Sequence, residues 1–365
     1  MNLLIVVAHL QKGGPVDVIY NLCCQLLQHQ NYYVNILTLR EEKQNSKIKD
    51  FQELGIYIEQ LKLTRQKCEL NVGNVTKQVQ QYVDENKIDI VHCHGYYPVL
   101  VCANLKKVLK YSTLHDRATE DFINVYGKVL GKWMLYRYFK ALNKFDKNIA
   151  VSNSAAELYE NYISNTTYVN NGIDVNKYRL IDKEQAEKLK YKLGLPLDRK
   201  IFISTGRIEK EKRYEELTAI FENVTTKYPV ALIVLGDGEK LEDCKKLANN
   251  NKQIIFTGRV SNVAEYLQCS DYYISYSKSE GMSMAVCEGI SCGLYPILSD
   301  IPSHRDAAND IDGYFFQEPK DINFDIILNK NIDKPYLHDY ICNHFSIETM
   351  GKGYIECYGD LLKNE

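Results

Sequence analysis

The chain has 365 residues, of which 45% are hydrophobic and 25% are charged, with 45 Lys and Arg against 47 Asp and Glu. This balance excludes a largely disordered, collagen-like or coiled-coil chain, and a net charge of −2 argues against a generally basic nucleic-acid binder. No stretch approaches the ~20 uninterrupted apolar residues that a transmembrane helix needs. The length predicts two globular domains.

Short apolar runs alternate with longer amphipathic ones in the first part of the chain. Runs that are apolar throughout are typical of strands buried on both faces of a parallel sheet. We expect strands over residues 3–8, 33–37, 88–92, 111–114 and 148–151, with helices over residues 16–28 and 75–85 among others. Strand–helix repetition indicates an α/β fold.

The second part repeats this pattern after a turn signal at Asn170-Asn171-Gly172 and a charged stretch. We expect strands over residues 201–204, 230–235, 253–256, 271–275 and 295–298, and helices over residues 213–227 and 241–250. Residues 338–362 have helical character with no strand after them. The predicted domains are residues 1–168 and 169–340, followed by a C-terminal helix over residues 341–365.

The cysteines and the N-terminus indicate the compartment. None of the 11 cysteines forms a C-x-x-C pair, the spacing of a zinc ribbon or a redox site. We interpret them as reduced, mostly buried thiols of a cytoplasmic protein. The first residues lack a basic region and a small-residue cleavage site, so we expect no signal peptide.

Ligands of open α/β sheets bind at the carboxyl ends of strands, so the residues that follow each predicted strand are candidates. Gly13 and Gly14 suit an anion at a helix start, although they also suit an ordinary turn. His92 and His94 could ligate a metal, but no third ligand stands nearby, so we favour a polar edge of a cleft. His115 follows the fourth strand, where it is either a substrate contact or a structural histidine.

Charged residues also follow two strands of the second part. Arg207 and Lys212 lie past the strand at residues 201–204, where basic groups beside helix amides suit a diphosphate; the alternative is a solvated charge run. Glu280 and Glu288 flank a small-residue, apolar helix start after the strand at residues 271–275. The backbone amides from Gly281 to Met284 could bind anionic oxygens, and carboxylates could hold sugar or ribose hydroxyls.

Together these residues resemble the family 4 retaining glycosyltransferases of the GT-B fold, and they are similar to members that build bacterial capsule and cell-wall polysaccharides. The resemblance spans most of the chain and is carried by Gly13-Gly14, His115, Asn171-Gly172-Ile173-Asp174, Gly206-Arg207 with Lys212, Gly236-Asp237-Gly238, Phe256-Thr257-Gly258, and Glu280 with Glu288. It implies two facing Rossmann-like domains with a donor/acceptor cleft between them. The last helix is expected to pack back on the N-terminal domain.

The resemblance also implies an activity and its residues. The enzyme would move a hexosyl or N-acetylhexosaminyl group from a nucleoside-diphosphate sugar, with UDP as the expected nucleotide, to a saccharide or lipid-linked saccharide acceptor. The implied catalytic residues are His115, Glu280, Arg207 and Lys212. The implied donor-binding residues are Gly13, Gly14, Gly206, Gly236, Val260, Gly281, Met282, Ser283, Met284 and Glu288.

The resemblance implies a reaction without metal or cofactor, because two cations and a helix terminus can neutralise the leaving diphosphate. Asp310-Ile311-Asp312 has the spacing of a metal motif but lies after the Glu280–Glu288 region, so we discount it. Two alternatives stay open: a nucleotide-sugar epimerase of the same fold, and a non-catalytic partner subunit, against which the full residue set argues. The chain lacks the G-x-G-x-x-G motif that an NAD-dependent oxidoreductase would have.

One residue departs from the pattern of the resembling family: Arg213 stands where the family often has glycine.

Residues 122–145 hold five basic residues and no acidic one, together with several large apolar side chains. One interpretation is a solvated helix face. The other is a basic amphipathic surface that lies on anionic lipid, which suits an enzyme on the inner face of the plasma membrane with a lipid-linked acceptor. No nucleic-acid partner is expected.

Overall fold

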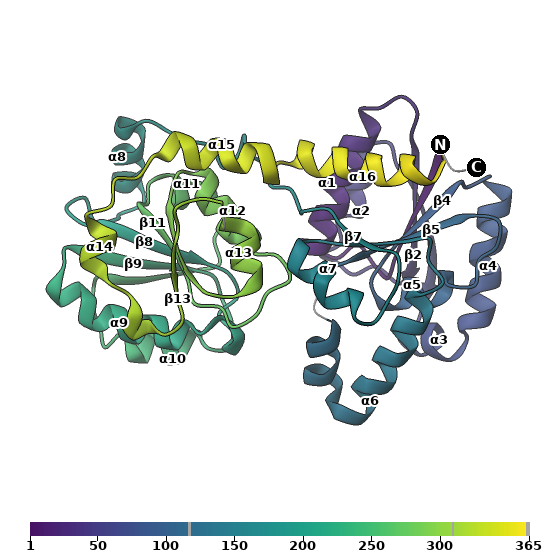
Figure 1. Cartoon of the computed structure of the whole chain (residues 1–365), viewed down its shortest axis with the longest axis horizontal. Helices are drawn as coiled ribbons and strands as arrows, with labels where there is room; N and C mark the ends of the chain where they lie inside the picture. The colour runs from purple at the N-terminus through teal and green to yellow at the C-terminus, as the bar shows by residue number, and fades with distance from the viewer. Residues whose placement is uncertain (116–117, 309, 363–365) are drawn as a thin grey trace. The chain divides into compact units, whose positions relative to one another are not determined.

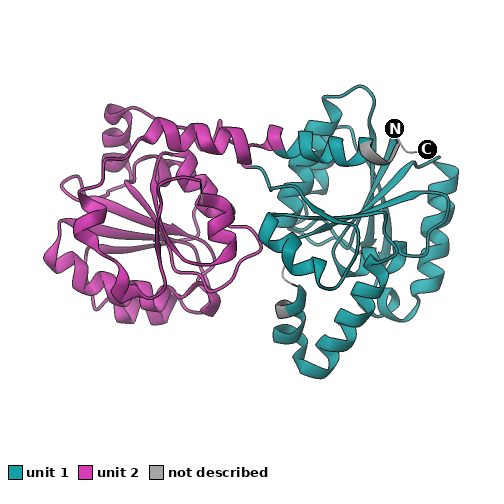
Figure 2. Ribbon diagram, in the orientation of Figure 1, with its two compact units in different colours: residues 1–172, 350–365 teal, residues 173–349 magenta. Residues whose placement is uncertain are grey.

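The computed structural model describes residues 1–115, 118–308 and 310–362, and the chain forms two compact α/β units (Figure 1). Unit 1 consists of residues 1–172 and 350–365, and unit 2 of residues 173–349 (Figure 2). The chain therefore leaves unit 1 once and returns to it at its C-terminal end.

Unit 1 is built on a 7-stranded parallel sheet in the order β3-β2-β1-β4-β5-β6-β7. Its strands are β1 (Asn2–Val7), β2 (Tyr33–Arg40), β3 (Tyr57–Leu63), β4 (Ile90–His94), β5 (Leu109–Leu114), β6 (Lys147–Ala150) and β7 (Thr166–Tyr168). The helices are α1 (Gly14–Leu27), α2 (Ile48–Glu53), α3 (Arg65–Leu70), α4 (Val72–Glu85), α5 (Tyr96–Cys102), α6 (Ala118–Leu142), α7 (Asn153–Glu160) and α16 (Ile347–Leu362).

The central strand of unit 1 shows why the inner strands read as unbroken apolar runs. Leu3, Ile5 and Val7 of β1 belong to one core cluster, whereas Leu4 and Val6 belong to another. Successive side chains of a strand point to opposite faces, so helices cover both faces of this sheet. Two-sided burial removes the polar alternation that a half-exposed sheet would show.

Unit 2 is built on a 6-stranded parallel sheet in the order β10-β9-β8-β11-β12-β13. Its strands are β8 (Lys200–Thr205), β9 (Val230–Leu235), β10 (Ile254–Gly258), β11 (Tyr272–Ser275), β12 (Tyr295–Ser299) and β13 (Tyr314–Phe316). The helices are η1 (Lys210–Lys212), α8 (Lys183–Lys192), α9 (Tyr214–Lys227), α10 (Leu241–Leu247), α11 (Val263–Gln268), α12 (Met284–Ser291), α13 (Pro302–Ala308), η2 (Pro319–Asp321), α14 (Phe324–Leu328) and α15 (Lys334–Phe345).

The ten strands expected from the sequence are all present, within a few residues of their predicted bounds. Three further strands, β3, β7 and β13, were missed, and each of them is the outermost strand of its sheet. Strands β7 and β13 have only three residues each, and β3 carries half-buried polar side chains such as Glu59. An edge strand pairs on one side only and needs no continuous apolar run, so it lacks the signal that identifies the inner strands.

The helical C-terminal stretch is interrupted at Ser346, between α15 and α16. Tyr354 and Tyr358 of α16 lie in the core of unit 1. A Cβ atom added to Gly353 would lie 2.9 Å from Cγ1 of Val169, so glycine lets this helix approach the sheet closely. The last helix thus completes the core of the unit in which the chain begins.

Within the described ranges, no helix is both long and apolar enough to cross a bilayer. The 11 cysteines are free thiols, and most of them are buried. Burial raises the pKa of several of these thiols, which keeps them protonated and unreactive.

Candidate active site

Glu280 lies at the centre of a buried charge cluster in unit 2. It follows β11, and its Oε1 atom is 2.9 Å from Lys212 Nζ and 3.6 Å from His304 Nε2. The Glu280 side chain is 9% exposed. Burial would raise its pKa, but His304 and the Lys212 ammonium outweigh burial and hold that pKa well below its usual range. The carboxylate is therefore ionised at neutral pH, and two strand-end loops meet at it.

His304 is a member of this cluster that the sequence analysis missed. Its side chain is fully buried in α13, and Nδ1 donates a hydrogen bond to the carbonyl oxygen of Ser299, 2.8 Å away. This bond orients the ring so that Nε2 faces Glu280. A signal was present, since His304 follows β12 at its carboxyl end, as the candidates in other loops follow their strands.

Glu288 lies on α12, about one turn beyond the first residue of the helix. Its carboxylate hydrogen-bonds the buried Tyr178 phenol, whose pKa is raised by burial and by this negative charge. A Cβ atom on the neighbouring Gly289 would lie 2.5 Å from the Tyr273 ring, so α12 sits directly on β11. Close packing of the helix and a tyrosine contact thus position Glu288.

The loop before α12 was expected to offer free amides from Gly281 to Met284. The Met284 amide donates to the carbonyl oxygen of Met282, 3.1 Å away, and the amides of Val286 and Cys287 donate to Ser283. Met282 and Ser283 are buried. In this conformation the Met284 amide is already engaged within the loop.

Arg207 is not part of the Glu280 cluster. Its side chain is 81% exposed, and its Nη1 atom lies 3.0 Å from Oε1 of Glu209. It follows β8 and Gly206, as expected, but it points toward a neighbour in its own loop. Of the two predicted diphosphate-binding cations, only Lys212 contacts Glu280 in the structure.

Gly206, Gly236 and Gly238 bring neighbouring strand ends of unit 2 close together. A Cβ atom on Gly236 would lie 1.8 Å from the carbonyl oxygen of Gly206, and one on Gly238 would lie 2.4 Å from that of Ile208. These glycines are therefore needed for packing the loops after β8 and β9, whatever they bind. Val260, after β10, is half-buried.

Arg213, which stands where the resembling family often has glycine, adopts a left-handed conformation with φ 53° and ψ 38°. This region favours glycine because a Cβ atom is strained there. The guanidinium lies 4.1 Å from the centre of the Tyr276 ring and also pairs with Glu216. These contacts compensate for part of the backbone strain.

His115 belongs to unit 1, where it follows β5. Its Nε2 atom is 2.8 Å from Nδ1 of His94, and the two rings stack. Burial lowers the pKa of His115 to about 4, so the imidazole is neutral at physiological pH. A neutral ring donates one hydrogen bond and accepts another, and His94 is positioned to select the tautomer.

His92 corrects the interpretation of the two strand histidines as a polar cleft edge. It is fully buried, with Nδ1 2.7 Å from the Tyr358 hydroxyl and Nε2 2.8 Å from Thr113 Oγ1. Both ring nitrogens are thus occupied, and the residue is part of the core beneath His94. Among the described residues, no group of three or more His, Cys, Asp or Glu side chains is arranged to hold a metal ion.

Gly13 and Gly14 are exposed at the start of α1. A Cβ atom on Gly14 would meet nothing within 4 Å, and one on Gly13 would meet only the Gln11 carbonyl oxygen at 4.0 Å. Packing within unit 1 therefore does not require glycine at either position, in contrast to Gly236.

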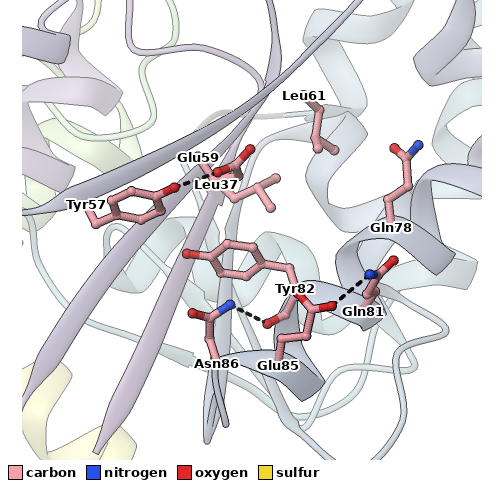
Figure 3. Close-up of a pocket in the computed structure, with 9 residues that line it drawn as sticks. All are labelled: Leu37, Tyr57, Glu59, Leu61, Gln78, Gln81, Tyr82, Glu85 and Asn86. Carbon is pink, nitrogen blue, oxygen red and sulfur yellow. Dashed lines mark hydrogen bonds between the residues drawn. The ribbon is translucent and has the colours of Figure 1, made fainter.

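A pocket of about 440 Å³ lies elsewhere in unit 1, between the edge strand β3 and α4 (Figure 3). Hydrogen bonds within its walls join Tyr57 to Glu59 on β3 and Gln81 to Glu85 on α4. Burial raises the pKa of Tyr82, at its floor, to about 12. None of the predicted site residues lines this pocket.

Two family descriptions match the chain. "Glycosyltransferase Family 4" matches residues 12–177, and "Glycosyl transferases group 1" matches residues 185–339. Together they cover most of the sequence, and each falls almost entirely in one of the two units.

Individual relatives share a low sequence identity with the chain. The chain is 24% identical to N-acetyl-alpha-D-glucosaminyl L-malate synthase of Bacillus anthracis, over 60% of this chain and 58% of the relative. It is 26% identical to alpha-monoglucosyldiacylglycerol synthase of Streptococcus pneumoniae, over 76% of this chain and 67% of the relative. Anabaena HepE, solved in complex with UDP, has the same fold, with a TM-score of 0.80 and 15% identity over 99% of this chain and 100% of HepE.

Proposed function

Because the chain belongs to the family 4 glycosyltransferases, we propose that it is a retaining, metal-independent hexosyl- or N-acetylhexosaminyltransferase that uses a UDP-sugar. The observation that carries this proposal is the Lys212–Glu280–His304 cluster, which places a cation and a fixed carboxylate at the carboxyl edge of the unit 2 sheet. That edge is where parallel sheets bind nucleotides.

In the proposed reaction, the acceptor hydroxyl attacks the anomeric carbon while the bond to the diphosphate breaks, and the hydroxyl proton passes to a leaving phosphate oxygen. Lys212 and Arg207 would neutralise the charge that develops on that leaving group. The Arg207 side chain is exposed and pairs with Glu209, so it would exchange this surface partner for the diphosphate. Glu280 would accept hydrogen bonds from sugar hydroxyls and, with Lys212, orient the transferred ring.

The remaining donor contacts follow from the same geometry. Glu288, held by Tyr178, would accept the two ribose hydroxyls of the nucleotide. The loop from Gly281 to Ser283 would contact the sugar and the phosphates, and Val260 would contact the base. We assign UDP because HepE, which shares the fold, binds it.

Two unit 1 features support a role in transfer. Gly13 and Gly14 leave open space at a helix N-terminus, which suits close approach of a phosphate. His115, which is neutral and oriented by His94, would donate a hydrogen bond to the transferred sugar while positive charge develops on the sugar ring.

The acceptor is proposed as a saccharide or a lipid-linked saccharide in bacterial surface polysaccharide synthesis. Two relatives are named as synthases of N-acetyl-alpha-D-glucosaminyl L-malate and of alpha-monoglucosyldiacylglycerol, so membership of the family does not choose the acceptor. A cytoplasmic location fits the free cysteines, because reduced thiols persist in a reducing compartment.

The test is to incubate the purified chain with a panel of nucleotide sugars, with and without saccharide and polyprenyl-linked acceptors. The proposal expects UDP release only when an acceptor is present, and a product whose anomeric configuration matches that of the donor. An isomerised donor without acceptor would instead identify an epimerase. Donor binding with no conversion on any acceptor would favour a non-catalytic partner subunit.

A further inference from the structure

Helix α6 of unit 1 is a helical hairpin that extends from the sheet (Figure 1). Gly127, with φ 76° and ψ 170°, breaks it into two arms. A Cβ atom on Gly131 would lie 2.5 Å from the carbonyl oxygen of Phe122, so the arms touch through this glycine. Close packing of the arms makes the hairpin a defined structural element.

The second arm carries large apolar side chains on two opposite faces. A helix on the surface of a water-soluble domain needs only one apolar face. One face buries Leu135, Tyr138 and Leu142 against the core. The opposite face carries Val129 and Trp133, which are 87% and 49% exposed. The other exposed large apolar residues of the hairpin are Val125, Leu130 and Tyr136.

Basic side chains surround this exposed apolar face. Lys128 and Lys132 lie on it, and neither has an ion pair among the described residues. Arg137 pairs with Glu69 and lies 4.5 Å from the Trp133 ring centre, which holds the indole at the surface. Glu120 and Asp121 belong to the start of α6, but residues 122–145 contain no acidic side chain, so the positive charge is concentrated in the part of the hairpin that follows them.

We propose that the tip of α6, residues 124–136, docks on an anionic lipid bilayer. Interleaved apolar, aromatic and basic side chains on one face are the pattern of helices that lie in a membrane interface, where tryptophan and tyrosine prefer the headgroup level. The charge distribution fits lipid as the occupant. Outside residues 122–145, acidic residues outnumber basic ones by 47 to 40, so an anionic surface repels the rest of the chain and attracts the hairpin.

This inference goes beyond the proposed glycosyl transfer and does not depend on it. Its consequence for that function is that the enzyme would meet acceptors presented at a membrane surface. Binding can be measured without donor, acceptor or turnover, so failure of one proposal leaves the other intact.

The hairpin holds the chain's single tryptophan, Trp133, which reports docking directly. Tryptophan emission of the full chain is measured against vesicles of phosphatidylglycerol with phosphatidylcholine, and of phosphatidylcholine alone, at low and high salt. We expect a blue shift with anionic vesicles at low salt, quenching by brominated lipid, and little change with neutral vesicles. No shift and no co-sedimentation with anionic vesicles at low salt overturns the proposal.

Charge-reversed variants separate the hairpin from net charge. Lys128→Glu with Lys132→Glu is expected to weaken vesicle binding by about 30-fold or more, since each basic residue near an anionic surface strengthens binding about fivefold. The matched control, Lys183→Glu with Lys188→Glu, makes the same charge change on exposed α8 and is expected to bind like the wild type. Equal weakening in both variants contradicts the assignment to the hairpin.

Val129→Asp tests the apolar part of the face, because it places a charge where the chain would enter the headgroup region. It is expected to abolish the blue shift while far-ultraviolet circular dichroism stays unchanged, as Val129 is almost fully exposed. A blue shift that instead rises with protein concentration in the absence of vesicles shows that a second copy covers this face, and overturns the lipid assignment.

Discussion

Lys212 and Glu280 come from different strand ends and lie 2.9 Å apart, largely shielded from water. Such a pair adds little stability by itself, because desolvating both charges offsets their attraction. Removing Lys212 leaves the buried Glu280 carboxylate without its ammonium partner, so Lys212→Ala tests folding and catalysis together. Arg207 is the cleaner probe, because its side chain is exposed and leaves nothing buried behind.

We predict that Arg207→Ala lowers kcat by about 10²–10³-fold, the usual loss for a contact made to charge that develops in the transition state. Its melting temperature is expected to stay near that of the wild type. Lys210→Ala, an exposed lysine in the same loop, serves as the control and is expected to keep full turnover. Near-normal turnover of both Arg207→Ala and Lys212→Ala contradicts the assignment of the diphosphate site.

The backbone at Arg213 allows a second test, on stability. Arg213→Gly and Arg213→Ala both remove the contacts with Tyr276 and Glu216, but alanine keeps a Cβ atom at φ 53°. We predict that the glycine variant is more stable than the alanine variant by about 1 kcal/mol, the reverse of their order in a helix interior. Urea unfolding of the two variants side by side measures this difference. Greater stability of the alanine variant contradicts the left-handed conformation.

At the scale of elements, the candidate site depends on how closely helices approach the sheets. Helix α12 lies on β11 through Gly289, and this contact sets the height of Glu288 and of the loop that holds Glu280. In unit 1, His94 of β4 stacks on His115, and the centre of the His92 ring lies 4.4 Å from that of His94. Neither arrangement involves a ligand, so both can be tested by stability alone.

Gly289→Ala is predicted to destabilise unit 2 by about 1–3 kcal/mol, because the new Cβ atom would lie 2.5 Å from the Tyr273 ring. The control is Gly73→Ala in α4, where a Cβ atom meets nothing within 4 Å. That change is expected to stabilise the chain by about 0.5–1 kcal/mol, since alanine has the higher helix propensity. Thermal unfolding compares the two, and a neutral Gly289→Ala would show that α12 does not sit this tightly.

The histidine stack predicts an acid-sensitive unit 1. Burial lowers the pKa of His92 to about 3 and that of His115 to about 4, and it places the pKa of His94 well below 6.5. The unfolded chain therefore binds more protons between about pH 4 and 6.5, so stability is full above this range and falls as the pH is lowered through it. From pH 7.5 to 5.5 the loss is on the order of 1 kcal/mol per histidine, and therefore a few kcal/mol for the three.

Hydrogen exchange of the β1 amides at the two pH values measures this loss in unit 1. His92→Gln removes one of the three titrating groups and is expected to reduce the pH dependence by about a third. An unchanged dependence in this variant would show that His92 is not held neutral in the folded state.

At the scale of the whole molecule, each unit provides part of the proposed chemistry, with the diphosphate and ribose contacts in unit 2 and His115 in unit 1. The chain crosses between the units near Gly172 and again within α16. The activity therefore belongs to the full chain and is expected in neither unit alone.

Metal independence is a prediction at this scale. Arg207, Lys212 and the N-terminus of α12 supply the positive charge that a divalent ion supplies in other transferases. Turnover of the full chain is expected to persist in EDTA. Loss of turnover on chelation, with recovery on adding Mg²⁺ or Mn²⁺, contradicts this.

The α/β class, the ten strands with strong apolar runs, the strand-end segments that hold Lys212 and Glu280, and the helix that holds Glu288 could all be predicted from the sequence. Two-sided burial makes an inner strand apolar throughout. The glycines and charged residues at a strand end come directly after the strand in the chain. These signals are local, so they can be read without knowing the tertiary fold. The catalytic and binding roles of these residues remain predictions.

The other features depend on contacts between distant parts of the chain. The edge strands β3, β7 and β13 are defined by pairing with a neighbour, and His304 and Glu280 face each other although they are 24 residues apart in the chain. His92 was misjudged because its partner Tyr358 lies 266 residues away, on the helix that completes unit 1. In each case the contact joins segments distant in the chain, and periodicity and spacing carry information only about neighbours.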